Sequence, residues 1–254
     1  MKVTFLGTGT SQGVPVIGCE CAVCRSLDFR DKRFRTSIHL EAQGVSLVVD
    51  TGPDFRMQML RAGIKKLDAV LFTHEHKDHT AGLDDIRPYN FLQQQDMPVF
   101  GRKQVLEQIR REFSYIFSDK RYPGVPQVDC VEIDENPFHV NGLPITPIPV
   151  LHYKLPVLGF RIGDFSYITD ANYISDESVK LLEGTEILVL NALQKDAHIS
   201  HFTLDEAIRE ARKIGAKMTY FTHISHRLGR HDQVDSELPK GMALAYDGLE
   251  LSLP

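Results

Sequence analysis

Residues 69–80 constrain this chain more than any other stretch, because an apolar strand runs directly into three histidines and an aspartate. Residues 69–72 have the continuous apolar character of a buried parallel strand. The ligand-type side chains follow within six positions, as His74, His76, Asp78 and His79. That spacing fits neither one face of a helix nor one side of a strand, so a loop must bring the side chains together. Imidazoles and a carboxylate that converge from a loop predict a metal site.

The His-x-His-x-Asp-His spacing of residues 74–79 resembles the metal signature of the metallo-β-lactamase superfamily. The resemblance implies an α/β fold, a four-layered αββα metallo-β-lactamase sandwich. We expect a single domain over residues 1–254, because a chain of this length with 42% apolar residues can bury a sizeable core. The superfamily contains lactamases, glyoxalases, nucleases and phosphodiesterases. The motif therefore implies fold and metals more strongly than it implies a substrate.

Three later strands also end in ligand-type residues, which are His152, Asp170 and His223. A lone histidine after a strand is usually a cap or a polar loop residue, but the order of these three matches the remaining superfamily motifs. Imidazole and carboxylate ligands suit zinc, manganese or iron. The resemblance implies two metals bridged by Asp170, one held by His74, His76 and His152, the other by Asp78, His79 and His223.

Asp50 closes the predicted strand 45–50, next to the strand that carries the histidine motif. The resemblance implies that Asp50 lies beneath the metals, where it orients a ligand and does not bind metal itself. From the residues alone, a helix cap for the segment that begins at Asp54 is an equal alternative, because aspartate suits that position.

Three of the four cysteines, Cys19, Cys21 and Cys24, lie within six residues. In a reducing compartment such a cluster indicates a metal site more than a disulfide. Three thiolates still lack a fourth ligand, which must come from elsewhere in the chain. A structural metal would also order the long loop that carries these cysteines.

Both ends of the chain are similar to the phosphoribosyl cyclic phosphate phosphodiesterases of phosphonate breakdown. The similarity rests on the glycine-rich residues 7–15 with the cysteine cluster, and on Thr-His-Ile-Ser-His at residues 222–226. It implies that His226 completes a structural zinc site with the three cysteines, and that the protein is a homodimer. It also implies hydrolysis of a small cyclic phosphate ester, such as phosphoribosyl 1,2-cyclic phosphate, with two catalytic divalent metals (manganese, zinc or iron).

A candidate general acid lies ahead of a predicted helix. Thr203 and Glu206 have the spacing of a helix capping box, which predicts that His201 lies just before the helix and near the mouth of the site. In the related phosphodiesterases and tRNA-processing nucleases, a histidine from this region protonates the leaving oxygen. We take His201 as the general acid and His198 as the second candidate. Asp78 is counted among the catalytic residues as well as the metal ligands.

Charge and hydropathy limit the other functions. The net charge of −5 argues against a general nucleic-acid surface, and the sequence has no long Gly- and Lys-rich arm for gripping tRNA. A tRNA 3′-end endonuclease, which shares the catalytic motifs, stays an alternative. A non-catalytic metal-binding scaffold is the other, although the full set of seven ligands argues against it. No apolar run approaches the roughly twenty residues of a membrane span, so we expect a cytoplasmic protein without membrane contact.

Overall fold

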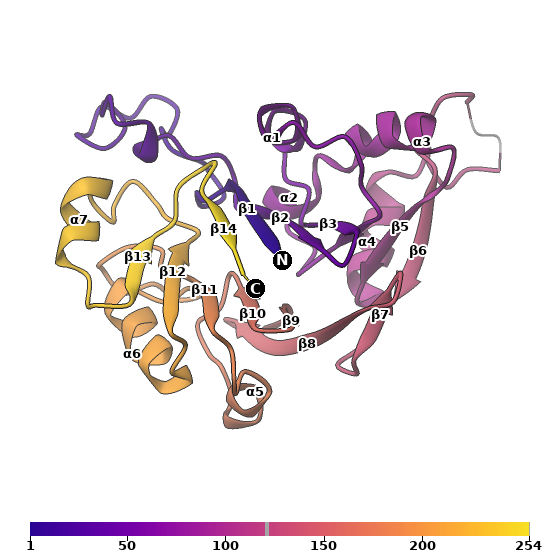
Figure 1. The fold of residues 1–254 in the computed structure, drawn as a ribbon. Helices are drawn as coiled ribbons and strands as arrows, with labels where there is room; N and C mark the ends of the chain where they lie inside the picture. Colours follow the sequence, from indigo (N-terminus) through magenta and orange to yellow (C-terminus); the bar gives the residue numbers. More distant parts are fainter. Residues whose placement is uncertain (120–121, 254) are drawn as a thin grey trace.

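Two seven-stranded sheets form the centre of the computed structural model, which describes residues 1–119 and 122–253 (Figure 1). The first sheet has the order β14-β1-β2-β3-β4-β5-β6 and contains β1 (Lys2–Gly7), β2 (Ser37–Ala42), β3 (Val45–Val49), β4 (Ala69–Leu71), β5 (Met97–Gly101), β6 (Val128–Glu132) and β14 (Glu250–Ser252). The second sheet has the order β13-β12-β11-β10-β9-β8-β7 and contains β7 (Phe138–Val140), β8 (Leu143–His152), β9 (Leu155–Ile162), β10 (Phe165–Ile168), β11 (Ile187–Asn191), β12 (Met218–Thr222) and β13 (Met242–Leu244).

Each sheet delivers several strand ends to one edge. The strands from β3 to β6 run parallel, and so do the strands from β10 to β13. Strand β8 is antiparallel to β9, which is antiparallel to β10, so β8 runs in the same direction as β10. The residues that follow β3 and β4 therefore lie at one edge of the first sheet. Those that follow β8, β10 and β12 lie at one edge of the second.

Three large apolar clusters lie between the layers and pack them together. One lies between the sheets, where Phe5 and Leu40 of the first sheet pack with Phe160 and Tyr167 of the second. Another joins the first sheet to α1 (Phe55–Ala62), α3 (Arg87–Gln93) and α4 (Lys103–Glu112). A third joins the second sheet to α5 (Asp176–Leu181), α6 (Leu204–Ile214) and α7 (His231–Glu237). Figure 1 shows the two helical layers outside the two sheets, so the predicted αββα sandwich is confirmed.

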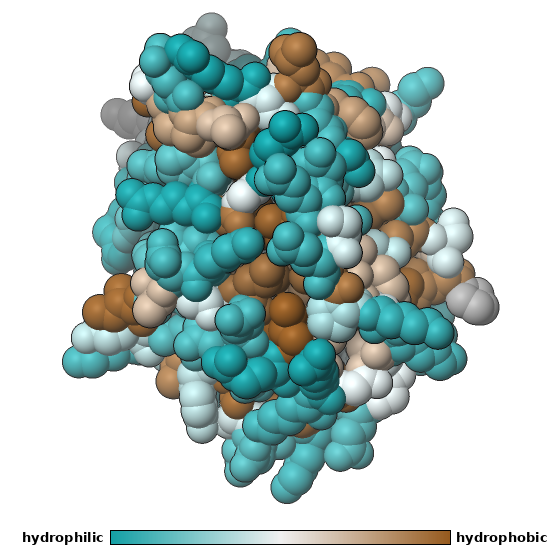
Figure 2. Space-filling view, turned by 90° about the vertical axis from the view of Figure 1, so that its left-hand side faces the viewer, coloured by the Kyte–Doolittle hydropathy of each residue, from teal (hydrophilic) through white to brown (hydrophobic). Residues whose placement is uncertain are grey.

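The remaining helices are short, namely α2 (Lys77–Thr80) and the 3-10 helices η1 (Phe29–Asp31) and η2 (Leu83–Ile86). Figure 2 shows the face on the side of α7 and β13, where hydrophilic side chains surround a narrow hydrophobic strip. None of the helices that the structure describes combines the length and the apolar character needed to cross a membrane. The single domain, the homodimer and the cytoplasmic location stay predictions.

A buried histidine in the first sheet should make folding stability depend on pH. His39 lies in β2, 3% exposed, and burial together with the charge of Lys2 lowers its pKa from 6.5 to about 4. Below pH 6.5 the unfolded chain therefore binds a proton at His39 that the folded chain does not bind. Stability from this group is complete above pH 6.5 and is lost as the pH falls. We expect a loss of about 2 kcal/mol between pH 7 and 5 from His39.

Urea denaturation at pH 7 and 5 measures this loss. His39→Gln cannot titrate and should lose about 2 kcal/mol less than the wild type over the same interval. Because the two proteins share all other titrating groups, the contribution of those groups cancels when the two losses of unfolding free energy are compared. Equal losses in the two proteins would mean that His39 accepts a proton in the folded state as easily as in the unfolded one.

Candidate active site

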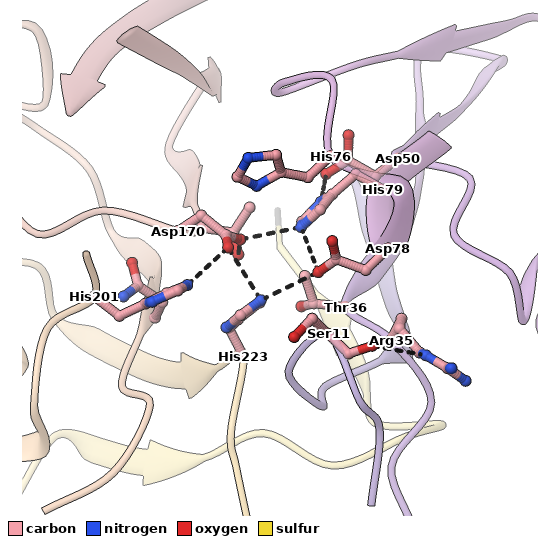
Figure 3. A network of polar contacts seen from close by, with 12 residues as sticks. Ser11, Arg35, Thr36, Asp50, His76, Asp78, His79, Asp170, His201 and His223 are labelled. Carbon is pink, nitrogen blue, oxygen red and sulfur yellow. Dashed lines mark hydrogen bonds and ion pairs between the residues drawn. The ribbon is translucent and has the colours of Figure 1, made fainter. Parts of the chain in front are cut away.

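The structure brings all seven predicted catalytic-metal ligands to the sheet edges where their strands end. Figure 3 labels five of them, which are His76, Asp78, His79, Asp170 and His223. Their ligand atoms form two groups, and within each group all of these atoms lie within 4.8 Å of one another. The first group contains His74, His76 and His152, and the second contains Asp78, His79, Asp170 and His223. Asp170 lies between several partners. Its two oxygens are 3.2 Å from Nε2 of His79 and 3.1 Å from Nε2 of His223. Two adjacent groups of this composition suit two divalent cations.

Buried nitrogen atoms that lie near carboxylates but form no hydrogen bond of good geometry provide a test of that fit. The Nε2 atoms of His74, His79 and His223 are buried and form no hydrogen bond within the described residues. A buried polar atom without a partner costs free energy, so native structures rarely leave several of them together. Here all three belong to the two ligand groups. Cations held by these nitrogens and the nearby carboxylates would satisfy them, so the residues present fit a metal centre.

Burial and charge act on the protonation of the site. Burial lowers the pKa of His74 well below its usual value, so the ring is neutral. Burial opposes the charge of Asp170, but the His223 and His79 rings outweigh it and hold the pKa of Asp170 well below its usual value. Burial also opposes the charge of His79, where the Asp78 and Asp170 carboxylates prevail and raise the pKa well above its usual value. The site thus favours positive charge at this point, which a proton or a cation can supply.

Asp50 supports the histidine loop. Its Oδ2 lies 2.7 Å from Nδ1 of His79 and accepts a hydrogen bond from the Thr73 hydroxyl at 2.8 Å, and its Oδ1 accepts from the Thr73 backbone at 2.9 Å. These contacts hold the His79 ring with Nε2 toward the centre of the site. The helix-cap alternative for Asp50 is wrong, because the residue at the start of α1 is Asp54.

Two backbone features that the amino-acid sequence alone does not reveal shape this edge. Three residues that follow strands have a positive φ, which is 66° for Asp50, 57° for Asp170 and 55° for His223. Residues other than glycine rarely adopt this left-handed region. Gly52 lies against the backbone of the histidine loop, where an added Cβ would be 2.2 Å from the Asp78 carbonyl oxygen. The only signal for this approach in the sequence is the glycine itself.

His201 and His198 differ in their distance from the ligand groups. His201 Nε2 lies 3.0 Å from Oδ1 of Asp170, and its side chain is 11% exposed. Burial, partly offset by the Asp170 hydrogen bond, lowers the pKa of His201 to about 4. His198 is exposed and contacts His201, with 3.1 Å between the two Nδ1 atoms. The predicted capping box of Thr203 and Glu206 is present at the start of α6, directly after His201.

The three clustered cysteines contact His226, the fourth ligand that the family resemblance implies. The sulfurs of Cys19, Cys21 and Cys24 lie 3.3, 3.4 and 3.6 Å from Nδ1 of His226. All four ligand atoms lie within 4.8 Å of one another, which fits a closed Cys3His zinc site. Ile224, between His223 and His226, donates its backbone N–H to Thr8 at 2.9 Å. Because His226 follows His223 by three residues, the cysteine cluster is joined to the end of β12, which carries a candidate catalytic ligand.

Cys21→Ser is expected to lower zinc content by one ion per chain and to reduce thermal stability. The serine hydroxyl is a poor substitute for a thiolate, and the loop then loses the metal that orders it. A loss of several kcal/mol corresponds to a decrease in Tm of about 10 °C in a chain of this size. Elemental analysis and differential scanning calorimetry measure the two quantities. Cys130→Ser, in β6 and outside the cluster, is the matched control. Unchanged zinc and Tm in Cys21→Ser would exclude the site.

Comparisons with known proteins agree with this geometry. A family model described as a beta-lactamase superfamily domain matches residues 46–224. A solved structure of a new diphosphatase from the PhnP family is 41% identical, with a TM-score of 0.93 over 100% of this chain and 98% of that one. An octanoyltransferase of Porphyromonas gingivalis is 40% identical over 98% of this chain, which spans about half (51%) of that protein's length. A ribonuclease Z of Mycobacterium sp. (strain KMS) is 25% identical over 88% of this chain and 84% of that protein.

The matched range contains every residue of the two candidate ligand groups. The agreement with the PhnP-family structure extends beyond that range to both ends of the chain. Fold, ligand groups and family model together support a hydrolase of the metal-dependent kind. This chain belongs to the beta-lactamase superfamily.

Proposed function

We propose that this protein is a metal-dependent phosphodiesterase that hydrolyses a small cyclic phosphate ester, such as phosphoribosyl 1,2-cyclic phosphate. The observation that carries the proposal is the two ligand groups around Asp170, with a further histidine, His201, in contact with the same carboxylate. Two neighbouring cation sites with a proton donor beside them suit hydrolysis at phosphorus. The similarity to a PhnP-family protein named as a diphosphatase supports a phosphate substrate.

The roles of the residues follow from their contacts. One cation would be held by His74, His76 and His152, the other by Asp78, His79 and His223, with Asp170 shared between them. Such cations, when bound, offset the charge of the phosphate and make a water nucleophile available near neutral pH.

The chain itself contributes orientation and a proton. Asp50 keeps the His79 ring turned toward the site through its 2.7 Å contact. His201 directs Nε2 at the same side of Asp170 that faces His223. A pKa of about 4 leaves this ring neutral in the free site, and the negative phosphate of a bound substrate would raise that pKa. The protonated Nε2 then donates to the sugar oxygen as the bond from that oxygen to phosphorus breaks. His198 is exposed and one contact further out, so we assign the acid to His201.

A tRNA 3′-end endonuclease is the second candidate, because relatives named ribonuclease Z align over most of the chain at 25% identity. The net charge of −5 counts against it, since phosphate contacts along RNA depend on lysine and arginine. A scaffold without catalysis is the weaker alternative, because all seven ligand positions carry ligand-type side chains.

The test is hydrolysis by manganese-reconstituted protein, with chelated protein as the control. The substrates are phosphoribosyl 1,2-cyclic phosphate, a dinucleoside diphosphate and an unprocessed tRNA precursor. Metal-dependent opening of the cyclic ester with intact tRNA is the expected result. Cleavage of the tRNA alone would favour the endonuclease. Preference for the dinucleoside diphosphate would mean that the enzyme cleaves a phosphoanhydride bond and not a phosphodiester. No turnover of any substrate by fully loaded protein would favour the scaffold.

A further inference from the structure

Ser200 contacts two histidines of the site at once. It lies in the connection between β11 and α6, beside His201. Its carbonyl oxygen lies 2.8 Å from Nδ1 of His152, and its hydroxyl oxygen lies 3.1 Å from Nδ1 of His201. On the opposite side of the His201 ring, Nε2 faces Asp170 at 3.0 Å, as Figure 3 shows. The His201 ring therefore has a partner at both nitrogens, and the Ser200 hydroxyl is the partner on the side of the ring away from Asp170.

The partner of Nδ1 decides which way an imidazole ring presents Nε2. A serine hydroxyl can donate to a bare nitrogen and can accept from an N–H group, so it fits His201 in either form. The other neighbour of this nitrogen is His198, whose Nδ1 is also 3.1 Å away. His198 is exposed, and its Nδ1 in turn lies 3.4 Å from both the hydroxyl and the backbone nitrogen of Ser200. Ser200 thus contacts both histidines of this loop.

We propose that Ser200 is a positioning residue for proton transfer, and that its hydroxyl holds His201 so that Nε2 faces the leaving oxygen. The inference rests on the proposed function, in which His201 is the general acid. In that step the oxygen of water forms a bond to phosphorus and the bond from phosphorus to the leaving oxygen breaks. The proton on Nε2 moves to that oxygen, the proton that the attacking water loses passes to bulk solvent, and solvent then reprotonates Nε2. The carbonyl of Ser200 supports His152 separately, so removal of the hydroxyl alone leaves that contact in place.

Two esters that differ only in the leaving group separate orientation of the acid from general damage. Methyl p-nitrophenyl phosphate expels an anion that is stable without protonation, whereas methyl phenyl phosphate expels a more basic oxygen and depends more on the acid. For Ser200→Ala, we expect kcat/KM to fall about tenfold more with the phenyl ester than with the p-nitrophenyl ester, the size of effect typical of an orienting contact. Metal content should equal that of the wild type. Ser200→Thr keeps a hydroxyl and should recover most of the kcat/KM that Ser200→Ala loses with the phenyl ester.

The same pair of esters distinguishes failure of this inference from failure of the proposed function. His201→Ala should show the same dependence on leaving group, and more strongly. Equal losses with both esters in Ser200→Ala, alongside a leaving-group dependence in His201→Ala, would overturn the positioning role of Ser200 and leave the acid in place. If His201→Ala itself loses equally with both esters, the acid assignment fails and the role of Ser200 fails with it. If the wild type, despite full metal content, turns over neither these esters nor the cyclic ester, the phosphodiesterase itself is contradicted.

Discussion

Asp170→Asn is expected to lower kcat/KM for the cyclic ester by roughly a thousandfold or more and to reduce the content of catalytic metal. The carboxylate faces His79, His223 and His201 with distances between 3.0 and 3.2 Å, so every part of the site depends on its charge. An amide removes one negative charge and directs N–H groups toward the cation positions. Loss of several kcal/mol of stabilisation at a metal centre corresponds to about three powers of ten in rate.

Steady-state kinetics and elemental analysis on the same preparation measure both effects. Asp164→Asn provides the control, because Asp164 is exposed in the turn between β9 and β10, the strand that leads to Asp170. It should behave as the wild type does. Full activity with two catalytic metals in Asp170→Asn would show that this residue bridges nothing.

His201→Ala is expected to lower kcat for the cyclic ester by about 100-fold to 10,000-fold while metal content stays unchanged. The reason is its position, since His201 contacts Asp170 at 3.0 Å and comes from the opposite side to the histidine loop. Without a proton donor, the sugar oxygen must leave as an alkoxide. The measurement is turnover at saturating substrate together with the metal-to-protein ratio.

His139→Ala, which removes an exposed histidine from β7, should change neither quantity. A large loss of metal in His201→Ala would give this residue a different role. His152, Asp170 and His201 form a third group whose ligand atoms lie within 4.8 Å of one another, so ligation by His201 is the specific alternative that this experiment tests.

The arrangement of the ligands could be predicted because it follows from strand direction. An apolar run that stops at His74 and a second that stops at Asp50 indicate adjacent parallel strands, and parallel strands end at the same edge. Strands β3 and β4 pair in this way, with Leu47 opposite Ala69. The approach of the two sheets to each other is a different matter. It depends on packing between distant side chains such as Phe5 and Phe160, and only the resemblance to a family supplied it.

Ser200 shows why the rest could not be predicted. It lies in a loop without apolar periodicity, and serine is common in such loops for reasons that have nothing to do with function. Its carbonyl contact to His152 joins residues 48 positions apart, and nothing at either position signals the pairing. The close approach of Gly52 to the Asp78 backbone could not be predicted either, because a glycine in a turn is usually explained by the turn conformation alone.

The three residues with left-handed backbone conformation at the strand ends lower folding stability at positions that the proposed activity needs. Asp50, Asp170 and His223 each adopt a backbone conformation that costs about 1 kcal/mol more for them than for glycine. An engineer who stabilised this chain by giving turns their preferred residues would change these positions early. The product would be a more stable protein that lacks the proposed bridging carboxylate Asp170, the proposed ligand His223 and Asp50, which contacts His79. Attempts to raise the stability of this chain should therefore begin at the outer helices and leave the inner edge of both sheets untouched.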